Sequence, residues 1–132
     1  MKRSLKAGGG MNPKKLNQVT GKWGERLGED YIKKCGYEIV ERNVRSPFGE
    51  IDLIAEDQGT LVFIEIKTRL NDSFGFAEEA VDERKKNQLV RLASWYLTRF
   101  PKANPRIRFD VLAVQKEGPH CNIRLIQNAL DL

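Results

Sequence analysis

Apolar residues recur along this chain with two different periods, and the change from one period to the other predicts the order of its helices and strands. From Thr20, a plausible N-cap, apolar residues recur every four positions until Gly36, a typical stop signal. The stripe consists of Trp23, Leu27, Tyr31 and Cys35, with Ile32 beside it. The pattern therefore predicts a first helix with one buried face.

Short apolar and β-branched runs separated by turn residues follow this helix. We expect three strands, at Tyr37–Val44, Glu50–Ala55 and Leu61–Lys67. Pro47 and Gly49 mark the turn within residues 45–49, and the run Asp57-Gln58-Gly59 marks the next turn. Three consecutive strands joined by tight turns predict an antiparallel meander.

A second helical pattern comes after a polar loop at Thr68–Gly75. This helix is expected to begin at Ala77 or Asp82 and to end at Arg99, before Pro101. Its inward face should consist of Leu89, Leu92, Ala93, Tyr96 and Phe100. The periodicity thus predicts a helix that packs one apolar face on the sheet.

Two further strands are predicted at Ile107–Val114 and Asn122–Ile126, joined through a turn at Gly118-Pro119-His120. The order is helix, three strands, helix, two strands. This order predicts an α/β (α+β) fold of the mixed-sheet kind, with helices flanking the β-sheet.

Length and composition fit one domain. A chain of 132 residues, of which 40% are hydrophobic and 31% charged, can bury a single core. Residues 1–19 hold the run Gly8-Gly9-Gly10, Pro13 and five Lys or Arg, so we expect a flexible basic tail there. That tail either contacts a phosphate backbone or has no role. Residues 20–132 are expected to form the single folded domain.

The charge balance favours a polyanionic partner, because 23 Lys or Arg face 18 Asp or Glu, for a net charge of +5. Cys35 and Cys121 are too few for a disulfide scaffold, and with the single His120 they make no four-ligand zinc set. The chain has no apolar targeting core and no stretch long enough to span a membrane. We therefore expect a cytoplasmic protein with no membrane partner.

The candidate chemistry lies in the second and third strands. Glu65 and Lys67 are two residues apart, so their side chains share one face of the third strand. Asp52 lies between Ile51 and Leu53 in the second strand. Counted from the intervening turn, Asp52 and Glu65 are six or seven residues out on each arm. The two carboxylates should therefore lie almost opposite each other.

Two buried carboxylates in this arrangement repel each other unless a cation lies between them, and hard oxygen ligands select Mg²⁺ or Mn²⁺. The alternative is a structural interstrand pair, in which Lys67 neutralises Glu65 and Asp52 only supports the turn. Because three ionisable groups are embedded together in apolar strands, a functional site is the preferred interpretation.

These residues resemble a known family. The stretches Gly49-Glu50-Ile51-Asp52-Leu53-Ile54-Ala55 and Val62-Phe63-Ile64-Glu65-Ile66-Lys67-Thr68-Arg69 are similar to the YraN-like family of predicted endonucleases in the PD-(D/E)XK (restriction-endonuclease-like) superfamily. Archaeal Holliday-junction resolvases look like relatives. The resemblance extends from about Gly21 to Val114 and includes Gly24-Glu25, Arg42-Asn43 and Arg108-Phe109-Asp110-Val111.

The resemblance implies a restriction-endonuclease-like core and a role for each residue of the motif. Asp52 and Glu65 would bind the metal, helped by the Ile66 carbonyl, and Lys67 would orient or activate the attacking water. Glu25 matches the acid of the family's first helix and would bind metal directly or through water. Glu25 is seven residues before Ile32 and so borders the packed face of the helix; the alternative is a solvated helix flank.

Several polar and basic residues are candidate contacts to a phosphate backbone. Lys85 is expected on the inward stripe of the second long helix, from which it could reach over the sheet edge. The weaker candidates are Lys86, Gln88, Arg69, Arg42 and Arg45. Ordinary exposed charge is the alternative for each of them. His120, in a turn away from the acids, is expected to be a surface side chain.

The expected function is metal-dependent hydrolysis of phosphodiester bonds in DNA, with branched and single-stranded forms as candidate substrates. The alternative is a non-catalytic nucleic-acid-binding or protein-interaction module that retains the nuclease fold. An enzyme of small phosphate esters is less well supported, because this short chain provides little material for a closed pocket. A homodimer would suit paired cuts on a branched molecule.

Overall fold

A computed structural model describes residues 13–69, 82–102, 106–117 and 119–130 of the chain. The elements are α1 (Pro13–Lys34), β1 (Glu38–Ser46), β2 (Gly49–Asp57), β3 (Thr60–Arg69), α2 (Glu83–Arg99), β4 (Arg106–Glu117) and β5 (His120–Ile126). Their order is the predicted one, so the α+β fold is confirmed.

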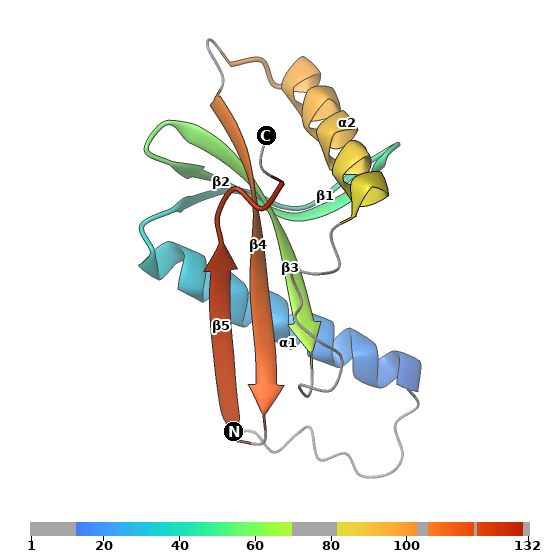
Figure 1. The fold of residues 1–132 in the computed structure, drawn as a ribbon, viewed down its shortest axis with the longest axis vertical. Helices are drawn as coiled ribbons and strands as arrows, with labels where there is room; N and C mark the ends of the chain where they lie inside the picture. Colours follow the sequence, from blue (N-terminus) through green and yellow to red (C-terminus); the bar gives the residue numbers. More distant parts are fainter. Residues whose placement is uncertain (1–12, 70–81, 103–105, 118, 131–132) are drawn as a thin grey trace.

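The five strands form one mixed sheet in the order β1-β2-β3-β4-β5. The pairs β1–β2, β2–β3 and β4–β5 are antiparallel, whereas β3 and β4 are parallel. A parallel pair needs a crossover, and α2 lies in the crossover between β3 and β4. The helices cover opposite faces, with α2 in front of the sheet and α1 behind it (Figure 1).

Each helix packs its own hydrophobic core against one face of the sheet. The core under α2 contains Leu89, Leu92, Ala93 and Tyr96 of the helix and Val44, Ile51, Ile54, Leu61, Phe63 and Phe109 of the strands. The core under α1 contains Ile32 and Tyr37 with Leu53, Ala55, Val62, Ile64, Leu112 and Val114. Alternation along β3 therefore sends Leu61 and Phe63 to the α2 face and Val62 and Ile64 to the α1 face, as predicted.

Helix α1 begins at Pro13, seven residues before the predicted N-cap Thr20, and so extends into the segment expected to be a tail. Proline is favourable in the first turn of a helix, because its fixed φ suits the helix and its missing N–H would have no partner there. Residues 1–12 lie outside the described residues.

The end of α1 is the predicted one. Gly36 has a φ of +94°, and the Tyr37 N–H donates to the Ile32 carbonyl while the Gly36 N–H donates to Lys33. This is a Schellman cap. The predicted burial of Cys35 is wrong, because the cap turns that residue into solvent and leaves its thiol exposed and free.

Helix α2 starts after Asp82, whose carboxylate accepts the Lys85 N–H at 2.9 Å, so the later of the two predicted starts holds. The earlier start, Ala77, and most of the loop Thr68–Gly75 lie outside the described residues. The prediction that Phe100 faces inward is wrong: Phe100 is 52% exposed, because it lies at the C-cap of the helix, where its ring centroid is 4.9 Å from that of Tyr96.

Within the described residues, neither helix is long and apolar enough to cross a membrane.

Candidate active site

The predicted carboxylates lie where β2 and β3 separate. Regular pairing between these strands ends at Leu53 opposite Ile64, and the same register places Asp52 opposite Glu65. Beyond this point β3 continues beside β4 as far as Arg69, while β2 continues beside β1. The polar residues therefore occupy a gap between two diverging strands, as the count from the turn predicted.

Asp52 bridges this gap with its side chain. Its Oδ2 accepts the Ile66 N–H at 2.7 Å, so a carboxylate replaces the next backbone hydrogen bond of the ladder. The N–H and C=O of one residue point to the same side of a strand. The Ile66 carbonyl therefore also faces the gap, where the sequence placed a metal-binding oxygen.

The environment of Asp52 favours its protonated form. The pKa of Asp52 is raised to about 6, mainly by burial and in addition by the negative charges of Glu65 and Glu25. The Ile66 N–H and the Lys67 ammonium act in the opposite direction. Asp52 is thus within electrostatic reach of the other three predicted residues.

Glu65 lies on the α2 side of the gap and is 8% exposed. Its Oε2 is 3.0 Å from Nζ of Lys67, on the same strand, and 3.1 Å from Nζ of Lys85, on α2. Its Oε1 is buried and has no hydrogen-bond partner among the described residues. The structure therefore brings Lys85 to the predicted cluster and leaves one carboxylate oxygen of Glu65 available.

Glu25 reaches the same gap from the α1 side. It lines a cavity of about 330 Å³ together with Asp52, Leu53 and Ile66. Glu25 is partly buried rather than a fully solvated helix flank. The cavity is also lined by Lys22, Arg26, Glu29, Arg42 and Asn43.

Two glycines of α1 allow the helix to lie close to strands β3 and β4. The sequence pattern did not identify them as contact residues. A Cβ on Gly24 would come within 2.2 Å of the Thr68 Oγ1, and one on Gly28 within 2.6 Å of the Leu112 side chain. Both contacts are shorter than real Cβ atoms make. The four-residue spacing of these glycines puts both on one helix face, which is the signal that could have revealed the close approach.

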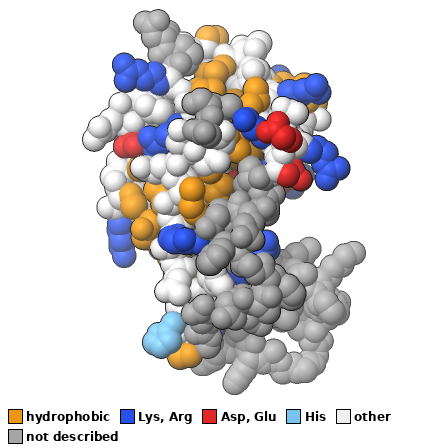
Figure 2. Space-filling view, in the orientation of Figure 1, with side chains coloured by type: hydrophobic (Ala, Val, Ile, Leu, Met, Phe, Trp, Pro, Cys, Tyr) orange, Lys and Arg blue, Asp and Glu red, His pale blue; other side chains and the backbone are white. Residues whose placement is uncertain are grey.

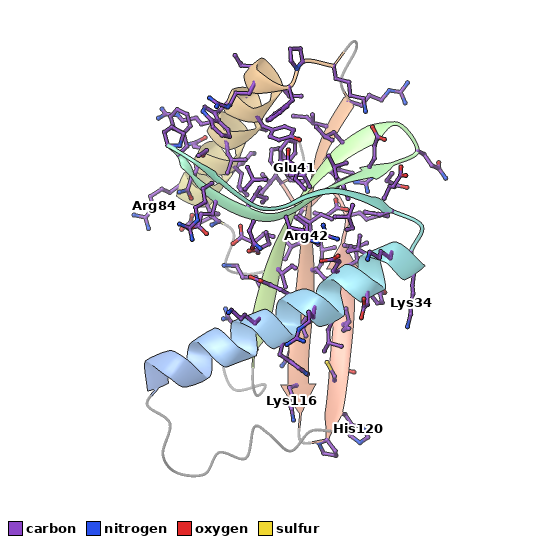
Figure 3. All side chains as sticks on the ribbon, turned by 180° about the vertical axis from the view of Figure 1, so that it is seen from behind. Lys34, Glu41, Arg42, Arg84, Lys116 and His120 are labelled. Carbon is purple, nitrogen blue, oxygen red and sulfur yellow. The ribbon has the colours of Figure 1, made fainter. Side chains whose placement is uncertain are left out.

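Arg42 lies beside this cavity and is already paired. Its guanidinium donates to both carboxylate oxygens of Glu29, with Nε at 2.9 Å from each. This contact holds the pKa of Glu29 below its usual range. Figure 3 shows Arg42 directed toward α1, whereas the adjacent Glu41 points to the other face. Arg42 therefore fixes β1 to α1, and its role as a phosphate contact stays a prediction.

The other predicted contacts are distributed around the molecule. Arg45 is exposed and loosely paired with Glu50 at 3.8 Å, and Lys86 lies 3.9 Å from Glu83. Arg69 follows Lys67 on the same face of β3, with its Nε buried and without a hydrogen-bond partner in the described part of the chain. The Gln88 side chain approaches Gly49.

His120 begins β5 rather than lying in the turn, and it is exposed at the far end of the molecule from the gap (Figure 3). Its surface position is confirmed.

A second polar cluster lies near the end of α1, and it was not predicted as a unit. Asp110 accepts hydrogen bonds from Tyr37, Arg108 and the Asn128 N–H. The Tyr37 hydroxyl accepts from Arg108 at 2.6 Å and from Gln127 at 2.7 Å. Burial raises the pKa of Tyr37 to about 12. This cluster ties the C-terminal turn to the sheet.

The donor set in the gap suits a hard divalent cation. Among the described residues no three His, Cys, Asp or Glu side chains surround a common point. Magnesium, however, is usually held by one or two carboxylates and keeps several waters. Asp52, the unpartnered Oε1 of Glu65 and the Ile66 carbonyl meet that requirement, and a cation would relieve the repulsion between the two carboxylates.

Fold and site together define a class: a small mixed-sheet α+β domain with an acidic and basic cluster between diverging strands. The chain also matches a known protein family. The profile of the Uncharacterised protein family UPF0102 matches residues 24–114, a range that contains Glu25, Asp52, Glu65, Lys67 and Lys85. The chain belongs to this family, which confirms the sequence resemblance.

Individual relatives match almost over their whole length. The UPF0102 protein of Symbiobacterium thermophilum is 46% identical over 116 residues, which cover 86% of this chain and 98% of the relative. The UPF0102 protein of Desulfosudis oleivorans is 44% identical over 114 residues, which cover 86% and 91%. The similarity therefore includes both faces of the gap.

Proposed function

We propose that this protein is a Mg²⁺- or Mn²⁺-dependent endonuclease that hydrolyses phosphodiester bonds of DNA. The observation that carries the proposal is the position of Asp52, in the gap between β2 and β3 and within electrostatic reach of Glu65, Lys67 and Glu25. Clusters of ionisable groups that perturb one another's pKa concentrate at functional sites.

A divalent cation bound by Asp52, Glu65 and the Ile66 carbonyl would supply charge stabilisation and a more acidic water. The protein's own groups then have separate tasks. Lys67 holds its ammonium 3.0 Å from Glu65, where it can orient a water and stabilise negative charge on a phosphate. Lys85 adds a second ammonium from α2 at 3.1 Å. Glu25 lines the opposite wall and is placed to bind a water.

The choice of DNA rests on charge and on the resemblance to the PD-(D/E)XK nucleases. The net charge of +5 favours a polyanion. No helix-turn-helix or zinc module that would read bases is recognisable in the sequence, so recognition by phosphate charge and shape is proposed.

The test is a cleavage screen of linear duplex, single-stranded, flapped and four-way-junction DNA, with Mg²⁺ or Mn²⁺ and with a chelator. We expect cleavage of at least one form, lost when the metal is chelated. Asp52→Asn and Lys67→Ala should each lower the rate at least about 100-fold, because each removes a group that acts on the reacting atoms. DNA affinity, measured by fluorescence anisotropy, should be largely retained.

Matched controls are Asp30→Asn and Lys34→Ala, which change exposed residues of α1 away from the gap. Both should cut at the wild-type rate. Metal-dependent cutting that survives Asp52→Asn and Lys67→Ala together would show that the site is misassigned.

One observation favours the non-catalytic alternative. Glu65 Oε2 is already neutralised by two lysines, as in a structural ion-pair cluster. A binding module of this kind would hold DNA without cutting any form at any metal concentration, and Mg²⁺ would only weaken its binding, as added salt does.

A further inference from the structure

Two adjoining cavities extend along the outer side of α2, outside the gap between β2 and β3. The first, of about 670 Å³, lies between the β1–β2 turn at Phe48 and the first turns of the helix. The second, of about 580 Å³, lies beside the later turns, from Val90 to Arg99. Phe48 and Arg91 line both cavities, so the two form one continuous groove, here called the α2 groove.

The α2 groove combines aromatic rings with guanidinium groups. The Phe48 ring is 38% exposed, although it lies in a turn where no core requires it. Trp95 lies at the far end, with the guanidinium carbon of Arg99 4.9 Å from its ring centroid. Figure 2, which looks onto the α2 face, shows hydrophobic and basic side chains next to each other over its upper half.

The charge of the α2 groove is predominantly positive. Helix α2 carries five Lys or Arg and one acid, Glu83, which faces Lys86. Arg84 projects outward from the first turn of the helix (Figure 3). Among the described residues, one acid lines the groove: Asp82, whose carboxylate caps the helix at the Lys85 N–H. The described lining of the groove therefore carries a net positive charge, which favours an anionic ligand.

We infer that the α2 groove binds single-stranded nucleic acid and leads it to the gap that holds Asp52 and Glu65; this inference rests on the proposed function. Aromatic rings that stack on bases, interleaved with basic groups that follow the phosphates, are the usual means of holding a single strand. A base in a duplex has both faces covered by its neighbours. An exposed ring such as Phe48 can therefore stack on an unpaired base without the cost of unstacking a duplex.

The α2 groove is continuous with the proposed active site, which supports the path that we propose for the nucleic acid. Lys85 lines the groove with one side and contacts Glu65 at 3.1 Å with its ammonium. From Arg84 to Arg99 the helix is roughly 22 Å long, from a rise of about 1.5 Å per residue. A length of this order accommodates several nucleotides, within the roughly 4–16 that single-strand-binding domains cover.

The experiment measures binding of a fluorescent oligothymidine of about 12 nucleotides to the full chain in chelator, so that no cleavage occurs. Phe48→Ala should weaken binding about ten-fold, the loss of one base–aromatic stack. Arg91→Ala should lower the slope of log affinity against log salt by about 0.7, the value for one phosphate contact on a single strand. A duplex of the same length should bind less tightly and be insensitive to Phe48→Ala.

Ile107→Ala and Arg106→Ala are the matched controls. Ile107 is also 38% exposed, Arg106 is exposed, and neither lines the groove. Both variants should bind as the wild type does. Equal affinity for duplex and single strand, or no effect of Phe48→Ala, overturns the inference. So does equally tight binding of polyglutamate, which would show a surface that recognises only charge.

The two proposals can fail separately. Oligothymidine binding that depends on Phe48, with no cleavage of any DNA, would support the binding role of the groove and contradict the proposed nuclease activity. Cleavage of a single-stranded substrate that depends on Asp52 and Lys67 but is unchanged by Phe48→Ala would support the nuclease activity and contradict the binding role of the groove.

Discussion

Two charged side chains are buried within the described part of this protein, and their surroundings differ completely. Asp110 is 1% exposed and Glu65 is 8% exposed, and each lies on one of the two central, parallel strands of the sheet. Asp110 accepts from an arginine, a tyrosine and a backbone N–H. In Glu65 one oxygen, Oε2, pairs with both Lys67 and Lys85, and the other oxygen has no hydrogen-bond partner among the described residues.

We interpret the difference as that between a structural carboxylate, Asp110, and a carboxylate proposed to be functional, Glu65. Buried charge is tolerated when its lone pairs are satisfied, as they are around Asp110. An unsatisfied oxygen beside a second carboxylate costs stability, and proteins retain such costs mainly at sites that act on a ligand. We therefore expect substitutions at Asp110 to affect folding and substitutions around Glu65 to affect activity.

The largest expected effect is on cleavage by Glu65→Gln. This change keeps the shape of the side chain and removes a carboxylate proposed to hold the metal, so the rate should fall about 1,000-fold. Cleavage per folded molecule, measured with Mn²⁺ and corrected by circular dichroism for the folded fraction, tests this. Asp110→Asn is the paired variant and should cut at the wild-type rate per folded molecule. An equal loss of cleavage rate in both variants would contradict the distinction between the two carboxylates.

Next in size is the effect of Asp110→Asn on stability. The new asparagine would keep one acceptor oxygen but no charge, so the partly buried Arg108 guanidinium would lose the negative charge of Asp110 and keep that of Asp57 at 3.2 Å. Breaking one side of a buried ion pair costs about 4 kcal/mol of unfolding free energy. Urea denaturation at pH 7 measures it, with Glu65→Gln as the comparison, which should lose much less.

Most substitutions lower the free energy of unfolding, but Asp52→Asn should raise it when the protein is measured in the presence of a chelator. The folded pKa of Asp52 is about 6, above its ordinary 3.8, so the folded state holds the proton more tightly. Stability should then fall as pH rises from about 4 to 6, by up to about 3 kcal/mol, and stay low above that range. The variant lacks this loss. The denaturation curves of wild type and variant should therefore coincide at pH 4, whereas at pH 7 the variant should be the more stable of the two.

The same pair of proteins tests the metal. Mg²⁺ or Mn²⁺ at pH 7 should raise the melting temperature of the wild type, since a bound cation stabilises the ionised Asp52, and should leave Asp52→Asn unchanged. A variant less stable than the wild type at pH 7 in chelator would mean that Asp52 is structural, like Asp110.

The smallest effect is expected from Tyr37→Phe. The ring stays in the core under α1, while the hydroxyl that links Asp110, Arg108 and Gln127 is lost. A loss of about 1 kcal/mol follows from the net value of such hydrogen bonds. Thermal unfolding measures it, and an unchanged cleavage rate would confine this cluster to stability.

The sequence by itself determined the order of the elements and the central triad. Apolar periodicity and turn residues are local properties, so they located all seven elements and the end of the first helix at Gly36. Period-two alternation and a short hairpin sufficed to put Asp52 opposite Glu65 and to place Lys67 on the face of Glu65.

Only the tertiary structure decided which further residues reach the gap. Lys85 is near Glu65 because α2 crosses that face of the sheet, and Glu25 is near Asp52 because Gly24 and Gly28 allow α1 to approach closely. The partners of Asp110 are likewise distant in sequence, with Tyr37 seventy-three positions away. Periodicity reports which side of an element is apolar, but it does not report which other element lies against that side.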